Sequence, residues 1–164
     1  MSWQDLLPKA SISQETMEAL GPVIKGQRLY NQAHYLEAES VYLQALEQYP
    51  LRSAGRVLIY NKLGILYEKI GDFRRALESY ERGVQQGALT PFTYQRMCRL
   101  LIEAKRFPQA LSCVRQGIKV LKEARTNLPQ EIYFWCVFQK LKHKIVRCML
   151  VADAAGRKKA DDGE

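Results

Sequence analysis

The sequence predicts an all-α protein made of antiparallel helix pairs. In the stretch from Ile59 to Val84, apolar residues recur at helical spacing in two short segments: Leu63, Tyr67, Ala76, Leu77 and Tyr80. Between the segments, Gly71 suits the left-handed end of one helix and Asp72 suits the cap of the next. The pattern recurs before and after this stretch, so the chain is predicted to repeat the helix pair.

Two small residues are expected where the helices of the central pair cross. Gly64 lies on the first predicted helix and Ala76 on the second. Packed helix axes lie only about 8–10 Å apart, so a bulky side chain at either position would widen the gap. The central pair is therefore predicted to be tightly packed.

The full spacing resembles a known repeat family. Its positions are Tyr60, Leu63, Gly64, Tyr67, Gly71, Asp72, Phe73, Ala76, Tyr80 and Gly83. They resemble the tetratricopeptide repeat (TPR), a helix–turn–helix unit of about 34 residues. The resemblance implies an α-solenoid, a right-handed superhelical array of antiparallel helix pairs.

The resemblance divides the chain into segments. They are an N-terminal lead-in (1–18), three repeats (19–52, 57–90 and 91–124), a C-terminal capping helix (125–152) and a polar tail expected to be disordered (153–164). Gly21 and Pro22 are expected to break or kink the first helical pattern. The spacing between repeats one and two exceeds the usual period by four residues, so 51–54 is either an inserted connection or an extra helical turn.

The last predicted helix should cover the exposed face of the third repeat, because a stack of repeats needs a cap. Its apolar stripe is Phe134, Val137, Phe138, Leu141, Ile145, Cys148, Met149 and Ala152. Tyr133 and Trp135 lie off this stripe. They either pack on the outside of repeat three or form a surface patch.

No catalytic constellation is visible, and the chain is predicted not to be an enzyme and to need no cofactor. The two histidines lie in different units, no glycine-rich phosphate loop follows a strand, and the four cysteines lack metal-site spacing. The N-terminus does not resemble a signal peptide, and no apolar run reaches the roughly 18 residues of a membrane span. A cytoplasmic location is expected.

The resemblance implies a binding site in the concave groove lined by the first helix of each repeat. The positions carried over are Val23, Gln27, Tyr30, Asn31, Asn61, Lys62, Ile65, Lys69, Phe92, Gln95, Arg96, Arg99 and Glu103. This set is polar, rich in amides and net basic, which suits a protein or peptide segment with acidic groups. The alternative is a groove that is only solvated or is filled by Trp3 and its neighbours.

The resemblance also allows one specific ligand to be tested. TPR co-chaperones hold the C-terminus of heat-shock chaperones with a two-carboxylate clamp of Lys, Asn and Arg residues. At the matching places this chain has Val23, Gln27, Lys62, Phe92 and Arg96. Only Arg96 agrees, so the clamp is predicted to be absent.

Function is predicted to be that of a protein-interaction adaptor or chaperone-like module. In size, repeat number and N-terminal lead, the chain resembles bacterial secretion chaperones. The alternative is an electrostatic binder of nucleic acid or anionic membranes, because the net charge is +8 and a basic group lies on the last helix. That group is Lys140, Lys142, His143, Lys144 and Arg147, and its other interpretation is a solvated helix face.

Overall fold

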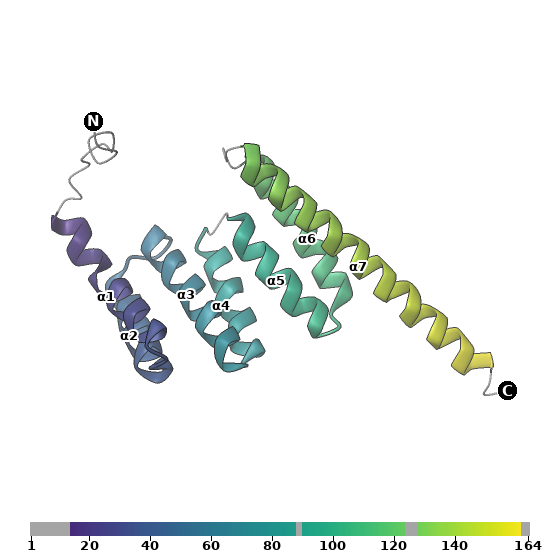
Figure 1. Cartoon of the computed structure of the whole chain (residues 1–164), viewed down its shortest axis with the longest axis horizontal. Helices are drawn as coiled ribbons and strands as arrows, with labels where there is room; N and C mark the ends of the chain where they lie inside the picture. The colour runs from purple at the N-terminus through teal and green to yellow at the C-terminus, as the bar shows by residue number, and fades with distance from the viewer. Residues whose placement is uncertain (1–13, 88–89, 124–127, 162–164) are drawn as a thin grey trace. The chain divides into compact units, whose positions relative to one another are not determined.

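The computed structural model describes residues 14–87, 90–123 and 128–161, which form seven helices and no strand (Figure 1). The chain divides into two compact units, Met1–Pro50 and Leu51–Glu164. The first unit contains α1 (Gln14–Asn31) and α2 (Tyr35–Gln48). The second contains α3 (Ala54–Ile70), α4 (Phe73–Gln85), α5 (Pro91–Glu103), α6 (Phe107–Glu123) and α7 (Leu128–Asp161).

The turn inside each helix pair has the same hydrogen-bond pattern. A residue with positive φ ends the first helix: Ala33 (63°), Gly71 (82°) and Lys105 (57°). The next amide donates to the carbonyl five residues back, from His34 to Leu29, from Asp72 to Tyr67 and from Arg106 to Leu101. These are Schellman-type helix ends. The sequence revealed only the central one, because Gly71 alone adopts the left-handed conformation without steric cost.

Within each of the first two pairs, a tyrosine ring packs against a glycine of the facing helix. A Cβ on Gly64 would lie 2.5 Å from the Tyr80 ring, and Gly26 meets Tyr42 in the same way. Both rings are almost fully buried, as is Ala76. The predicted close crossing in the central pair is therefore confirmed.

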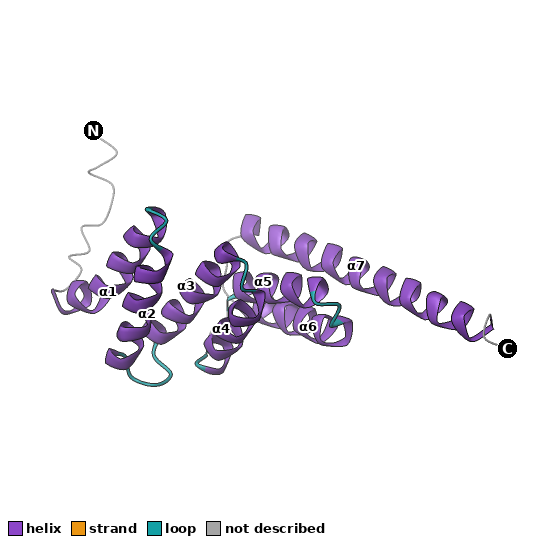
Figure 2. Ribbon diagram, turned by 90° about the horizontal axis from the view of Figure 1, so that it is seen from below, coloured by secondary structure: helices purple, strands orange, loops and turns teal. Residues whose placement is uncertain are grey.

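The last helix, α7, packs on α6 and α5 (Figures 1 and 2). The Phe138 ring fills the space left by Gly117 on α6, and both Phe138 and Ile145 are fully buried. The rest of the predicted stripe is half-buried except Ala152, which is exposed. In both views the C-terminal part of α7 extends beyond the end of α6. The helix thus covers α6 with the predicted face.

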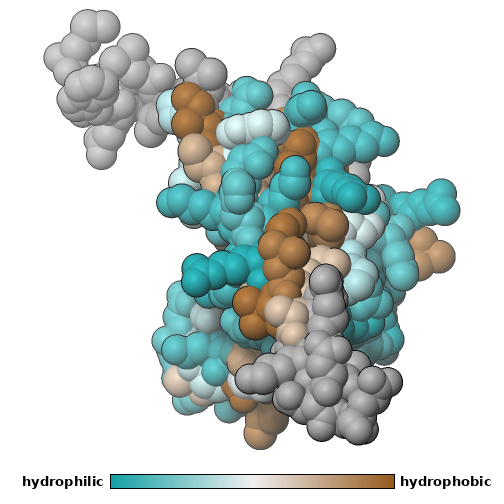
Figure 3. Space-filling model, turned by 90° about the vertical axis from the view of Figure 1, so that its right-hand side faces the viewer, coloured by the Kyte–Doolittle hydropathy of each residue, from teal (hydrophilic) through white to brown (hydrophobic). Residues whose placement is uncertain are grey.

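Of the two alternatives for Tyr133 and Trp135, the surface patch fits Tyr133, whereas Trp135 also lines a hollow with Leu121 and Lys122 of repeat three. Both side chains are exposed, by 56% and 42% respectively. Exposed apolar residues also occur further along α7, at Val146, Leu150 and Val151. Figure 3, which views the molecule from the side where α7 ends, shows hydrophobic side chains gathered on that surface.

The structure decides three expectations about helix boundaries. Pro22 lies inside α1, which runs from Gln14 to Asn31, so of the two alternatives at this position the break is excluded and the kink is left. The helix α3 starts at Ala54, capped by the Ser53 side chain, so three of the four residues 51–54 form an inserted connection and only Ala54 lies in the helix. The helix α7 continues past Ala152 to Asp161, because that stretch consists mainly of Ala, Arg and Lys, which favour helix. The remainder of the lead-in and tail, 1–13 and 162–164, lies outside the described residues.

Within the described ranges, no helix has the length and hydrophobicity needed to cross a membrane. The same ranges contain no group of three or more His, Cys, Asp or Glu side chains arranged to hold a metal ion.

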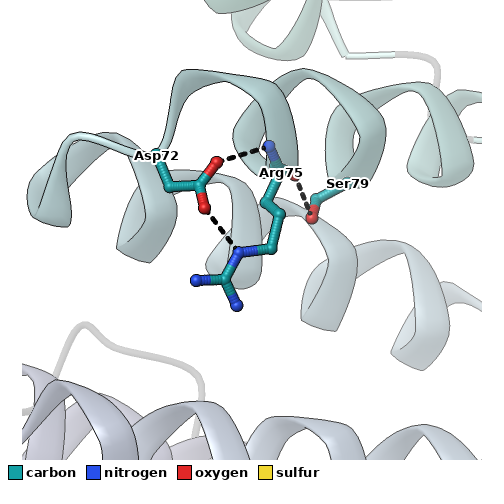
Figure 4. Close-up of polar contacts among 3 residues, drawn as sticks. All are labelled: Asp72, Arg75 and Ser79. Atoms are coloured by element: carbon teal, nitrogen blue, oxygen red, sulfur yellow. Dashed lines mark hydrogen bonds and ion pairs between the residues drawn. The ribbon is translucent and has the colours of Figure 1, made fainter.

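The start of α4 is fixed by one carboxylate (Figure 4). Asp72 accepts hydrogen bonds from the backbone N–H of Arg75 at 2.9 Å and from its Nε at 2.6 Å. One turn on, the Ser79 hydroxyl donates to the Arg75 carbonyl. The Arg75 backbone amide, helped by its side chain, holds the pKa of Asp72 below its ordinary value of 3.8. The charged form of this cap therefore stabilises the folded state.

This cap predicts a pH dependence. Because the pKa of Asp72 is lower in the folded than in the unfolded chain, its stabilisation is complete above pH 3.8 and is lost as the pH falls through the folded value. At neutral pH, wild type should be more stable than Asp72→Asn, whose cap is uncharged. Urea unfolding at a series of pH values should show the two converging below pH 3.8. A gap that stays constant down to pH 2 would contradict this assignment.

The close crossing of α3 and α4 predicts that adding one methyl group at Gly64 destabilises the fold. Gly64→Ala should lower the free energy of unfolding by about 1–3 kcal/mol, because the buried Tyr80 ring must move. Gly21→Ala is the matched control, since a Cβ there meets nothing within 4 Å. The gain in helix propensity of about 0.5–1 kcal/mol is opposed by contact of the new Cβ with the Pro22 ring, so the free energy of unfolding should change by less than about 1 kcal/mol. Both changes are measured by urea unfolding, with loss of helicity as the signal. Equal stability of Gly64→Ala and wild type would show that the two helices do not cross closely at Gly64.

Candidate functional site

The candidate site of the second unit lies on the first helices of its two pairs, α3 and α5. Two side-chain contacts join these helices. The Thr93 hydroxyl donates to Asn61 Oδ1 at 2.9 Å, and Arg96 pairs with Glu68, with its Nη1 2.9 Å from both carboxylate oxygens. We call this surface the α3–α5 face; it consists of Asn61, Lys62, Ile65, Glu68, Lys69, Phe92, Gln95, Arg96 and Arg99.

Glu68 is the centre of a hydrogen-bonded network on this face. The Tyr80 hydroxyl donates to Glu68 Oε1 at 2.5 Å, so Tyr80 and Arg96 share one carboxylate oxygen. Burial and the bond to Glu68 raise the pKa of Tyr80, so its proton stays on the phenol. Burial alone would lower the pKa of Arg96, but its hydrogen bond and charge interaction with Glu68 outweigh that effect and raise it. Tyr80 and Arg96 therefore keep their protons near neutral pH.

Arg96 is held in place by these contacts. Its side chain is 28% exposed, and its guanidinium lies over the Phe92 ring, 4.8 Å from the ring centre. We expected Arg96 to be one of the cations offered to a ligand. The structure shows instead that its charge is balanced by Glu68.

The other positions on the face differ in exposure. Lys69, Phe92 and Arg99 are exposed, and neither cation makes an ion pair within the part of the chain that the structure describes. Lys62, Ile65 and Gln95 are half-buried. The face therefore presents one aromatic ring and two positive charges to solvent.

The repeat-one positions lie in the first unit and form a separate group. Gln27 Nε2 donates to Asn31 Oδ1 at 2.8 Å, and the Tyr30 ring meets Tyr35 edge-on with ring centres 5.7 Å apart. Val23 is only 5% exposed and belongs to the core of its unit. Its assignment to the groove was wrong, because this turn of α1 faces inward.

Sequence reasoning missed three residues of the site: Glu68, Tyr80 in its polar role, and Thr93. Glu68 could have been found. It follows Ile65 by three residues and Asn61 by seven, which places all three on one helix face. Its pairing with Arg96 joins residues 28 positions apart, and no local pattern predicts such a pair.

The cysteines offer no nucleophile in the core. Cys98 and Cys113 are buried, and hydrogen bonding to Cys113 together with burial raises the pKa of Cys98. A protonated thiol is a poor nucleophile. Of the other two cysteines, Cys148 is half-buried and Cys136 is exposed.

No protein-family model matches the sequence, and no curated protein matches it either. Solved structures do. The Yersinia enterocolitica type III secretion chaperone SycD, in complex with a peptide of the translocator YopD, matches with a TM-score of 0.66 and 16% identity over 85% of this chain and 98% of its own. The TPR2B domain of yeast Sti1 in a pHsp70 complex has a TM-score of 0.61 and 14% identity, covering 80% and 98%. The Sgt2 TPR domain from Aspergillus fumigatus has a TM-score of 0.62 and 14% identity, covering 84% and 82%.

At these identities the likeness is one of fold. The chain has the TPR fold, an all-α array of antiparallel helix pairs, as the sequence predicted.

The network predicts that two arginines one turn apart differ in their effect on stability. Arg96→Met should lower the free energy of unfolding by about 1–2 kcal/mol, because it removes charge-assisted hydrogen bonds from a partly buried carboxylate. Arg99→Met removes the same charge from an exposed site and should change stability by less than about 0.5 kcal/mol. Urea unfolding of both variants gives the comparison, and equal losses would show that the Glu68 pair contributes nothing.

Proposed function

We propose that this TPR-fold chain is a non-enzymatic adaptor or chaperone-like module that binds a protein segment on its α3–α5 face, in the cytoplasm. One observation carries the proposal. Beside the contacts that join α3 to α5, the face exposes Phe92, Lys69 and Arg99, while the charge of Arg96 is balanced by Glu68. An aromatic ring beside unpaired cations suits an acidic segment with an apolar anchor.

The structural neighbours support a peptide ligand. SycD was solved with a peptide of YopD, and the Sti1 domain was solved in a pHsp70 complex. Those ligands belong to those proteins. For this chain, they favour the general class of a protein segment bound by helix pairs.

The chemistry of the face favours an acidic segment that differs from a carboxylate-clamp ligand. A charge-assisted hydrogen bond to a carboxylate contributes about 1.5–3 kcal/mol, and Lys69 and Arg99 can each make one. The clamp would need Arg96, which is already bound to Glu68. We therefore propose that acidic side chains within a segment, not a terminal carboxylate, contact this face.

A second candidate function rests on α7. Lys140, Lys142, His143, Lys144 and Arg147 are all exposed on this helix. Such a basic surface attracts nucleic acid or anionic lipid through charge, with an affinity that falls steeply as salt increases. Their spacing in the sequence spreads these cations around the polar side of α7 instead of gathering them in one stripe. We therefore prefer the α3–α5 face as the binding site.

The two functions predict different results for matched double variants. A peptide selected on the full chain from a random library, labelled with a fluorophore, serves as the probe. Lys69→Ala with Arg99→Ala should weaken its binding tenfold or more, which corresponds to about 1.4 kcal/mol. Lys140→Ala with Lys144→Ala should weaken it less than threefold, because exposed pairs contribute about 0–1 kcal/mol each. Fluorescence anisotropy measures both, with circular dichroism as the folding control.

The same variants test the alternative. A random-sequence DNA duplex and phosphatidylserine vesicles are the probes, each at two salt concentrations. Stronger binding to either than to the peptide, lost in the Lys140/Lys144 variant, would replace the proposed function with the electrostatic one.

A further inference from the structure

We infer that the outer side of α7, next to α6, binds an acidic amphipathic helix of a partner protein. The helix α7 packs on both helices of the preceding pair, as α5 packs on α4 and contacts α3. Each of α1, α3 and α5 is also covered by the second helix of its own pair. Within the part of the chain that the structure describes, α7 has no second helix, so the side that such a helix would cover is open.

Side chains on this open side form a stripe along α7. Successive members are three or four residues apart, which places them on one helix face. The first and last members are apolar and lie 18 residues apart, which is about 27 Å along the helix axis. They are 55% and 64% exposed. We call this set the α7 stripe; it consists of Ile132, Trp135, Gln139, His143, Val146 and Leu150.

One end of the α7 stripe lies in a hollow beside α6. The hollow measures about 300 Å³ and is lined by Leu121 and Lys122 of α6 and by Glu131, Ile132 and Trp135 of α7. Leu121 is only 1% exposed, so it forms an apolar base. A helix can lay its apolar face into such a groove between two helices, whereas a lipid bilayer is too broad to enter it. The shape of the site therefore favours a helix as occupant.

The charge of α6 and α7 favours an acidic occupant. Residues 107–123 and 128–152 contain only two carboxylates, Glu123 and Glu131, and Glu123 is paired with Lys119 at 3.9 Å. Against these stand seven cations, and α7 has no Asp or Glu at all between 132 and 152. The cations are Arg115, Lys119, Lys122, Lys140, Lys142, Lys144 and Arg147.

Two of these cations border the α7 stripe. Lys142 precedes Val146 by four residues, and Arg147 follows His143 by four. Both cations are exposed. A helix with Glu or Asp beside its apolar face would neutralise them, whereas a second copy docked by the same surface would bring like charges together. The expected ligand is therefore a helix with apolar residues near both ends and carboxylates along their border.

The α7 stripe does not depend on the proposed function, because it shares no residue with the α3–α5 face. The same helix supplies a matched control. Tyr133 and Val151 are also 18 residues apart, and they are 56% and 63% exposed. Each follows an end of the stripe by one residue, which turns its side chain by about 100° around the helix axis. The two pairs thus have equal exposure and face in different directions.

The test uses three capped, fluorophore-labelled peptides of about 18 residues, the length of the stripe. The first is an amphipathic helix with leucines on one face and glutamates along its borders. The second has the same residues in an order that gives no apolar face, and the third has lysine in place of glutamate. Fluorescence anisotropy with the full chain should show the first binding tenfold or more tightly than either of the others, a difference of about 1.4 kcal/mol.

Variants then locate the site. Ile132→Ala with Leu150→Ala should weaken binding of the first peptide tenfold or more. Tyr133→Ala with Val151→Ala should weaken it less than threefold, and circular dichroism checks that both variants stay helical. Lys69→Ala with Arg99→Ala, which alters the α3–α5 face, should also have little effect.

A second comparison tests the charges. Lys142→Gln with Arg147→Gln should weaken binding more than Lys140→Gln with Lys144→Gln, which removes the same charge further from the stripe. Equal losses would show that only the net charge of α7 matters and would overturn the inference.

Other results would also overturn it. These are equal binding of the first and second peptides, equal losses in the two alanine pairs of α7, or a loss confined to the Lys69/Arg99 variant. Tighter binding of a DNA duplex or of phosphatidylserine vesicles than of the first peptide would replace the helix with that ligand. A concentration-dependent dimer that Ile132→Ala with Leu150→Ala disrupts would make the stripe a contact between copies.

Discussion

The Tyr80 side chain connects the packing of the C-terminal unit to its surface chemistry. Its ring packs against Gly64, and its hydroxyl donates to Glu68, which also holds Arg96 of the next helix pair. The close approach of α3 and α4 is thus what brings the hydroxyl within reach of the carboxylate. A wider crossing would leave Glu68 with Arg96 alone, and the position of α5 against α3 would be less constrained.

This arrangement decides which charges remain for binding. Because Glu68 neutralises Arg96, the cations left on the α3–α5 face are those outside the network, with Lys69 and Arg99 the most accessible.

Sequence reasoning predicted what depends on local pattern. The helix pairs, the crossing at Gly64 and the buried stripe of α7 follow from residue spacing and side-chain size. It could not predict the left-handed conformations of Ala33 and Lys105, because neither residue type favours them and the repeat geometry imposes them. Nor could it predict that Arg96 is paired, because that depends on how α5 packs against α3. The end of α7 lies beyond the predicted Ala152, because a polar stretch is typical both of disorder and of an exposed helix.

The coupling between Tyr80 and Arg96 through Glu68 is the most direct test of this network. A double-mutant cycle with Tyr80→Phe, Arg96→Met and the double variant measures it by urea unfolding. Since both groups bind Glu68 Oε1, the losses should be non-additive, with an interaction free energy of about 0.5 kcal/mol or more. Additive losses would mean that the hydroxyl and the guanidinium act independently, and that the helix crossing does not position the binding face.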